Sequence, residues 1–363
     1  MFFVVAALEA GISPAIVMQG PARITIPNRR CFTGYNQPWT PGNAGDSSAG
    51  TYNMYGAVAN SVNTWFAQLA VKVGPERAVE VARRMGITNI PPRNSRAYAS
   101  WNVCSLVLGA REVSVLDMAG AFGVLANKGV RCAPYSITKV VAPGERQPLI
   151  DNKPDCKRVI SEKISTVTVD MLRGVITHGT GHRAALGGRP VAGKTGSAQN
   201  NTSAFFSGFT PQLSTSVWVG YRARRVPMRN LFNGGPVYGG TFPAIIFHNY
   251  MEAALAGLPA VGFPKAPPPP PPPKPREPKE KPQPPKPLKP PKPHKPRHPN
   301  VIVPGVVGLP VGTARFLVTA SGLSPGMAYT DRGQPGRVAA QSPGAGAQLP
   351  GGSRVTLVVS RRT

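Results

Sequence analysis

The sequence predicts an α+β fold in which helices cover an antiparallel sheet, followed by a small second domain. Three observations carry this prediction. Apolar residues recur at helical spacing in several stretches of the first 257 residues. Three strand-like runs then follow one another, joined by short turns, between residues 190 and 223. A proline-rich segment separates all of this from a compositionally different C-terminal stretch.

The expected helices share apolar positions three or four residues apart. The opening MFFVVAALEAG is apolar almost throughout, which indicates the middle of a buried helix. Pro75 suits the first turn of a helix and Gly86 suits its end. Residues 20–50, rich in Pro, Gly and Asn, and residues 178–188 are expected to form loops. The helices are expected at residues 1–11, 55–73, 74–87, 110–129, 165–176 and 243–257.

The expected strands alternate apolar and polar side chains. Residues 134–143, PYSITKVVAP, have this pattern by themselves. The runs at 190–199, 203–212 and 214–223 are close enough together to pair as an antiparallel sheet.

Composition divides the chain at a basic, proline-rich linker. Of the formal net charge of +27, ten Lys or Arg against two Glu in residues 264–299 supply about +8. Proline at this density excludes helix and sheet and predicts a polyproline II spacer. We therefore expect a folded domain at residues 1–258, a disordered linker at 259–300, and a small α+β domain at 301–363 with a helix near 311–321.

The charge favours an anionic cell-wall polymer or a membrane surface as partner of the linker. Nucleic acid is not expected, because residues 264–299 contain no aromatic residue to stack on bases and no recognition motif lies beside them. No transmembrane segment is visible, and the opening lacks the basic start of a signal peptide.

The four cysteines do not form a CxxC pair, so neither a metal site nor a redox site is expected, and no cofactor is implied. Cys132 and Cys156 flank a strand-and-turn segment and would suit a disulfide in an oxidising compartment. The alternative is that Cys31, Cys104, Cys132 and Cys156 are unrelated buried thiols.

Residues 194–197, Lys-Thr-Gly-Ser, are the first candidate for chemistry. On a strand, Lys194 and Gly196 face one way while Thr195 and Ser197 face the other. The lysine supplies a positive charge, the hydroxyls can donate to a carboxylate, and the glycine permits close approach of a ligand or backbone. The competing interpretation is a polar edge strand.

Ser61-Val62-Asn63 is the second candidate. Residues two apart do not share a helix face, so the pair fits a helix end or loop where both side chains point into a cleft. The competing interpretation is an ordinary helix cap. Acyl transfer by serine enzymes that recognise penicillin also needs S-x-x-K. The S-x-x-K of this chain, Ser136 to Lys139, follows S-x-N and alternates like a strand, so we reject it.

In combination these motifs resemble those of high-molecular-weight penicillin-binding proteins, most of all the bifunctional class A type of actinobacteria. The resemblance runs through NSVNTWFAQLAVKVG, EVSVLDMAGAFGVLANKG, LRGVITHGTGHRAAL and AGKTGSAQNNTSAFFSGFTPQLSTSVWVGY, and it covers nearly all of residues 1–255. The C-terminal stretch resembles a PASTA domain through VPGVVGLPVGTAR, SGL and SPGAGAQLPGGSRVTLVVS. The resemblance of residues 1–255 to penicillin-binding proteins implies a penicillin-binding, serine β-lactamase-like fold for residues 1–258.

The resemblance also implies roles. Ser61 would relay protons, Asn63 would bind the substrate amide, and Lys194 would support Ser61. Thr195, Gly196 and Ser197 would bind the carboxylate of a D-Ala-D-Ala stem peptide or a β-lactam, with the Ser197 N–H in the oxyanion hole. The loop Gly179-Thr180-Gly181 matches the family's loop before the K-T-G strand, with a role that could be only structural.

In this family A-A-L-E-x-G follows the S-x-x-K lysine, so Met1 falls just after the expected place of that lysine. The family is extracytoplasmic, with a membrane anchor and a glycan-polymerising domain expected only in a full-length form. We expect residues 1–363 alone to lack covalent acylation. The alternatives are a start assigned too late in an active D,D-transpeptidase, a non-catalytic binder of peptidoglycan fragments acting through the PASTA-like domain, and a defective product that folds poorly.

Overall fold

The computed structural model describes residues 1–31, 37–44, 48–267 and 299–361. They belong to two compact units, Met1–Pro275 and Arg276–Thr363, which are described separately. The predicted polyproline II spacer falls mostly on residues 268–298, which lie outside the described residues.

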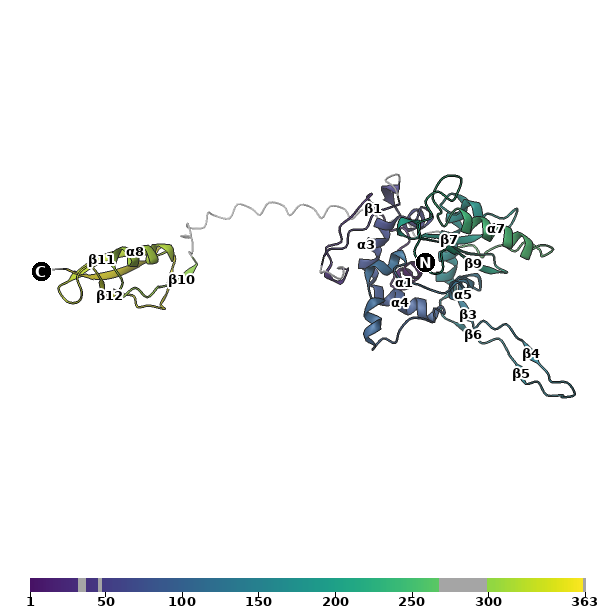
Figure 1. The fold of residues 1–363 in the computed structure, drawn as a ribbon, viewed down its shortest axis with the longest axis horizontal. Helices are drawn as coiled ribbons and strands as arrows, with labels where there is room; N and C mark the ends of the chain where they lie inside the picture. The colour runs from purple at the N-terminus through teal and green to yellow at the C-terminus, as the bar shows by residue number, and fades with distance from the viewer. Residues whose placement is uncertain (32–36, 45–47, 268–298, 362–363) are drawn as a thin grey trace, which may run out of the picture. The chain divides into compact units, whose positions relative to one another are not determined.

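A three-stranded antiparallel sheet organises the N-terminal unit (Figure 1). Its order is β7 (Ala192–Ser197), β8 (Ser203–Phe209) and β9 (Ser214–Gly220), as the three strand-like runs predict. The register pairs Lys194 with Ser207 and Thr195 with Phe206. Helices α5 (Val115–Ala126), α6 (Glu162–Thr177) and α7 (Phe242–Ala254) contact the sheet, which confirms the predicted α+β class.

The two faces of the sheet belong to different cores. Ala192 and Phe209 pack into the main core, together with helices α1 (Phe2–Glu9), α2 (Met54–Ala59), α3 (Asn63–Val73) and α4 (Pro75–Arg84). Phe206 lies on the other face, where it packs against Phe247 of α7 at a ring separation of 4.8 Å. The opening helix is buried along Phe3–Ala7, as its uninterrupted apolar sequence predicts.

Short elements connect the helices and the sheet. These are β1 (Met18–Gly20) paired with β2 (Gly50–Tyr52), and the 3₁₀ turns η1 (Arg29–Cys31), η3 (Arg96–Ser100), η4 (Cys104–Leu108), η5 (His182–Ala184) and η6 (Gln199–Asn201).

Three sequence expectations are wrong in detail. The single helix expected at 55–73 is divided into α2 and α3, because Ser61 adopts a left-handed φ of 53° between them. The strand expected at 134–143 is reduced to Lys139–Val140 (β4), because almost all of its side chains are exposed and no sheet face holds them. The helix expected from residue 110 begins only at Val115, where the Ser114 hydroxyl accepts a bond from the Asp117 N–H.

A long two-stranded arm projects from the N-terminal unit (Figure 1). Its base pairs β3 (Val130–Cys132) with β6 (Cys156–Arg158), and its outer part pairs β4 with β5 (Ile150–Asp151). A disulfide joins Cys132 to Cys156 at the base. A second disulfide, which the sequence did not single out, joins Cys31 to Cys104 across 73 residues.

The C-terminal unit is a small α+β domain with its own core. Strand β14 (Arg354–Ser360) pairs in parallel with β11 (Ser324–Thr330) and antiparallel with β12 (Val338–Ser342). Strand β10 (Asn300–Ile302) pairs with β13 (Gln348–Pro350), and α8 (Val311–Ala320) matches the expected helix. Val306, Val318 and Leu357 are among its buried residues. Within the described ranges of either unit, no helix has the length and apolarity that crossing a membrane requires.

Candidate active site

The site begins where β7 meets the turn between α2 and α3. The Lys194 ammonium donates a hydrogen bond to Ser61 Oγ at 2.7 Å, although the two residues are 133 positions apart. Asn53 caps α2 through its side chain, and Ser61 then takes the left-handed conformation that ends one helix and admits the next. The strand and this turn thus bring the two sequence motifs into direct contact.

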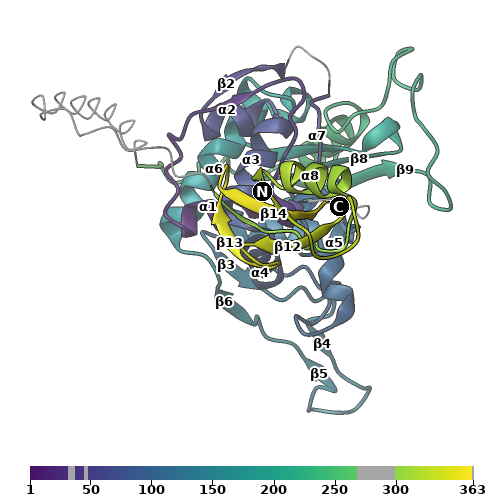
Figure 2. The same ribbon diagram turned by 90° about the vertical axis from the view of Figure 1, so that its left-hand side faces the viewer.

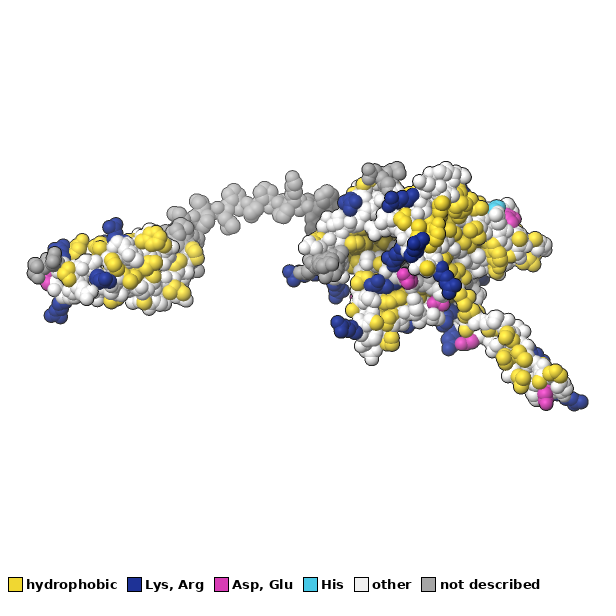
Figure 3. All heavy atoms as spheres, in the orientation of Figure 1, with side chains coloured by type: hydrophobic (Ala, Val, Ile, Leu, Met, Phe, Trp, Pro, Cys, Tyr) yellow, Lys and Arg dark blue, Asp and Glu magenta, His cyan; other side chains and the backbone are white. Residues whose placement is uncertain are grey.

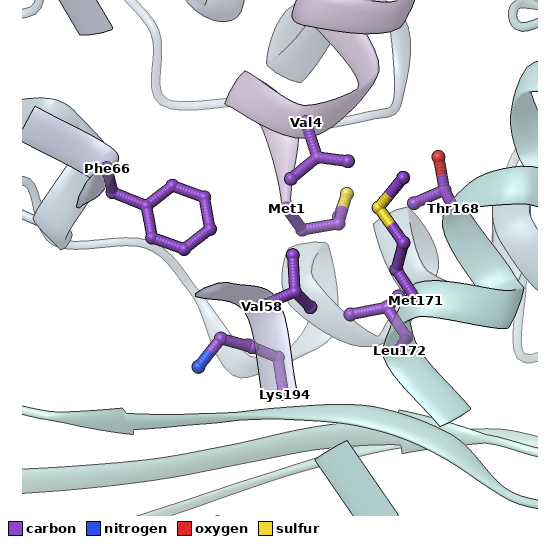
Figure 4. A pocket seen from close by; sticks show the side chains of 8 residues that line it. All are labelled: Met1, Val4, Val58, Phe66, Thr168, Met171, Leu172 and Lys194. Atoms are coloured by element: carbon purple, nitrogen blue, oxygen red, sulfur yellow. The ribbon is translucent and has the colours of Figure 1, made fainter. Parts of the chain in front are cut away.

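Burial tunes the charge of Lys194. The side chain is half-buried, and desolvation lowers its pKa to about 8. Figure 4 shows it at the edge of a small apolar cavity whose other lining side chains include Val58, Phe66 and Leu172. At pH 7 the amine is about nine-tenths protonated, so it donates to Ser61 while being easier to deprotonate than an exposed lysine.

Because Ser61 Oγ accepts from Lys194, the hydroxyl hydrogen of Ser61 can be donated to another group. A lysine–serine pair of this kind can pass a proton between the cleft and the amine. Acyl transfer requires protonation of the leaving-group nitrogen, and such a pair can supply the proton.

Thr195 is held by the loop before β7. Its hydroxyl lies 2.7 Å from that of Thr180, and the Thr180 N–H donates to the Ala59 carbonyl at 3.1 Å. A Cβ on Gly179 would lie 2.3 Å from the same carbonyl oxygen, so only glycine allows this approach. The Gly179-Thr180-Gly181 loop therefore ties α2 to the K-T-G strand, a role that the sequence left open and that requires knowledge of the packing.

Ser197 and Gly196 lie at the exposed end of β7. The Gly239 N–H donates to Ser197 Oγ at 3.1 Å. A Cβ on Gly239 would lie 2.7 Å from both the N and the O of Gly196, so backbone passes close beside the strand there. The sequence did not indicate a role for Gly239, because a pair of glycines before a helix is common in loops.

Asn63 is the first residue of α3. Its Nδ2 donates to the Gly42 carbonyl at 2.9 Å. Ser136 and Lys139, the S-x-x-K with strand-like alternation, lie on the projecting arm.

A cleft of about 180 Å³ opens beside the K-T-G strand. Lys194, Thr195, Gly196 and Ser207 line it on the sheet side. Its other lining residues are mainly apolar, among them Trp101, Leu106, Val107 and Val113. Arg111 is a charged residue of this lining. Among the described residues, no three His, Cys, Asp or Glu side chains gather closely enough to hold a metal ion.

Comparison with known proteins gives two family matches. Residues 1–252 match the penicillin-binding protein transpeptidase domain, and residues 301–361 match the PASTA domain. Penicillin-binding protein 1A of Aquifex aeolicus is 37% identical over 189 residues, 52% of this chain and 24% of that protein. Penicillin-binding protein 1A of Mycolicibacterium smegmatis is 32% identical over 237 residues, 62% of this chain and 30% of that protein.

Among solved structures, the penicillin-binding protein PonA1 from Mycobacterium tuberculosis is similar with a TM-score of 0.62 and 28% identity. The match covers 73% of this chain and 70% of that one. A second structure of PonA1, in complex with penicillin V, matches with a TM-score of 0.60. The chain spans about a quarter to a third of the length of the curated relatives named above. On its fold, its site and these matches, the chain belongs to the penicillin-binding protein transpeptidase family, with a C-terminal PASTA domain.

Proposed function

We propose that residues 1–258 supply the recognition half of a peptidoglycan D,D-transpeptidase site, which binds stem peptides ending in D-Ala-D-Ala and, equally, β-lactams. The observation that carries the proposal is the 2.7 Å contact between Lys194 Nζ and Ser61 Oγ beside the cleft. This contact places Ser61, the partner of Lys194 in a proton relay, beside strand β7, whose Thr195 and Ser197 hydroxyls can donate to a carboxylate.

In the proposed reaction a serine oxygen attacks the penultimate D-Ala carbonyl and the terminal D-Ala leaves. The acyl group then passes to the amine of a neighbouring stem peptide. Ser61 would deliver a proton to the departing nitrogen, with Lys194 restoring it. Thr195 and Ser197 would bind the terminal carboxylate, and the Ser197 N–H would stabilise the oxyanion. The Oδ1 of Asn63 would accept from the substrate amide.

The attacking serine and its lysine are not among these site residues, so the proposal concerns recognition and proton relay. The test is intact mass after incubation with a β-lactam. It is applied to residues 1–363 and to the same chain extended upstream, in frame, to an S-x-x-K. An adduct on the extended chain alone supports the proposal. An adduct on residues 1–363 would direct attention to Ser61 and Ser136, and no adduct on either would contradict it.

We place the protein in the cell envelope, outside the cytoplasmic membrane. Two disulfides in the N-terminal unit support this, because such bonds persist in oxidising compartments. Anionic wall polymers remain the proposed partners of the basic linker.

A second candidate function is binding of peptidoglycan fragments by the C-terminal unit. The separate core of this unit and its exposed aromatic side chains Phe316 and Tyr329 favour it. The test compares retention on insoluble peptidoglycan of residues 1–363 and of a chain ending at residue 300. Equal retention would count against a role of the C-terminal unit.

A further inference from the structure

The loop between β9 and α7 is strongly basic. It carries Arg222, Arg224, Arg225 and Arg229, all exposed, and no acidic residue lies between Tyr221 and Thr241. We call residues 221–238 the arginine loop. Figure 2 shows the segment after β9 running out from the body of the N-terminal unit. Figure 3 shows dark blue side chains on one face of this unit with few magenta ones among them.

The arginine loop packs against the sheet. Met228 and Val237 are buried against Ala204 of β8, and Val237 N–H donates to the Met228 carbonyl at 2.8 Å. Phe232 stacks edge-on with Phe242 at a ring separation of 5.1 Å. The exposed arginines therefore stand on an anchored support, which limits the entropy lost when they bind a ligand.

Both ends of the arginine loop are tied to the cleft. Directly after its last residue, the Gly239 N–H donates to the Oγ of Ser197, a residue of the proposed carboxylate site. Near its start, Arg225 Nη2 lies 3.2 Å from Glu112 Oε1. Glu112 stands between Arg111 and Val113, which both line the cleft. These contacts place the loop beside the K-T-G strand at one end and beside the cleft-lining segment 111–113 at the other.

Most of its positive charge is unpaired. Within the described ranges, an ion pair is found for Arg225, whereas neither an ion pair nor a side-chain hydrogen bond is found for Arg222, Arg224 and Arg229. Arginine presents a planar fork of donors that matches a carboxylate. Three such groups on a loop beside the cleft raise the local concentration of anions and favour an acidic ligand.

We propose that the arginine loop selects stem peptides carrying a second carboxylate, on a side chain outside the D-Ala-D-Ala terminus. This rests on the proposed function, because it concerns the substrate of the same cleft. Thr195 and Ser197 take the terminal carboxylate inside, and the guanidinium groups of Arg222, Arg224 and Arg229 take the additional one beside the cleft.

The test is calorimetric binding to residues 1–363 of two peptides that differ in one carboxylate. One is Nα,Nε-diacetyl-L-Lys-D-Ala-D-Ala, and the other carries diacetyl meso-diaminopimelate in place of lysine. At low salt we expect the second peptide to bind about 3- to 10-fold more tightly, since exposed charge pairs contribute modestly. The preference should shrink at 0.5 M salt, which screens exposed charges within about 4–5 Å.

The variant Arg222→Gln, Arg224→Gln, Arg229→Gln should bind both peptides within about twofold of each other, with its affinity for the lysine peptide unchanged. The matched control is Lys139→Gln, Arg146→Gln, Lys157→Gln, which removes the same charge from exposed positions on the projecting arm. The control should keep the preference.

The outcomes separate the two proposals. Binding of both peptides with equal affinity, unchanged in the loop variant, would overturn the loop's role and leave the proposed function standing. Failure of wild-type residues 1–363 to bind either peptide would count against the proposed function itself. Loop-dependent binding of a poly(glycerol phosphate) oligomer, without preference between the peptides, would assign the loop to a wall polymer and overturn the peptide proposal.

Discussion

Glycines at very close backbone contacts distinguish the N-terminal unit from the C-terminal unit. In the N-terminal unit, Gly179, Gly239 and Gly240 lie where an added Cβ would come within 2.2–2.3 Å of a backbone oxygen. In the C-terminal unit, Gly308 and others adopt positive φ in turns with no atom within 4 Å of the added Cβ. The first kind of glycine brings backbone segments together, and the second kind only reverses the chain.

This difference goes with a difference in electrostatics. The close contacts around β7 gather Ser61, Thr180, Lys194 and Thr195 into one network, and burial there lowers the pKa of Lys194 to about 8. In the C-terminal unit the polar side chains lie apart around an aliphatic core, and Arg361 stacks on Tyr329 at the surface, 3.9 Å from the ring centroid. The close backbone contacts at Gly179, Gly239 and Gly240 thus accompany the gathering of polar side chains into one site, and the C-terminal unit has no such gathering among its described residues.

Loss of the Cys31–Cys104 disulfide should produce the largest effect and should be confined to the N-terminal unit. The bond spans 73 residues, for which the chain-entropy model gives about 4 kcal/mol. Calorimetry of Cys31→Ser, Cys104→Ser should show a lowered transition of this unit and an unchanged one for the C-terminal unit, which has no cysteine. The control Cys132→Ser, Cys156→Ser acts on the arm, so an equal shift would contradict the prediction.

Gly179→Ala should destabilise the N-terminal unit by about 2–3 kcal/mol, because its Cβ would meet the Ala59 carbonyl oxygen at 2.3 Å. Denaturant unfolding measures this. Gly120→Ala is the matched control: it lies in α5 with no atom near the added Cβ and should stabilise by about 0.5–1 kcal/mol. Similar effects of both substitutions would mean that the approach of the two backbones does not matter.

Lys194→Met should weaken binding of Nα,Nε-diacetyl-L-Lys-D-Ala-D-Ala by about 10- to 100-fold, because it removes the ammonium that holds Ser61 and that we expect to attract the peptide carboxylate. The apolar stem of methionine preserves packing against the cavity. Titration calorimetry measures the affinity, with the exposed Lys163→Met on α6 as control. Unchanged affinity in Lys194→Met would remove this lysine from the recognition site.

The affinity for the same peptide should fall as pH rises through about 8, the pKa of Lys194. The protonated amine attracts the peptide carboxylate, so binding favours the charged form and weakens as the proton is lost. Between pH 7 and pH 9 we expect a decrease of about 3- to 10-fold. Lys194→Met should have lost this pH dependence, and its persistence there would assign it to another group.

Gly308→Ala should give the smallest effect, about 1 kcal/mol of destabilisation of the C-terminal unit. Its φ of +85° is unfavourable for alanine, although the added Cβ meets no atom. Gly312→Ala, at an open position in α8, should be neutral or stabilising. A loss as large as that of Gly179→Ala would erase the contrast between the two kinds of glycine.

The sequence by itself determined the α+β class, the three-stranded antiparallel sheet, the separate C-terminal domain and the alternation of Lys194 with Thr195, because periodicity and composition are local properties. Apolar spacing alone runs one helix through Ser61, whereas the S-x-N spacing indicates a helix end or loop there, as the turn between α2 and α3 has it. Only the tertiary structure decided that Ser61 meets Lys194, that Thr180 holds Thr195, and that the arginine loop borders the cleft. These contacts join residues far apart in the chain, and packing rather than local preference chooses which distant groups come together.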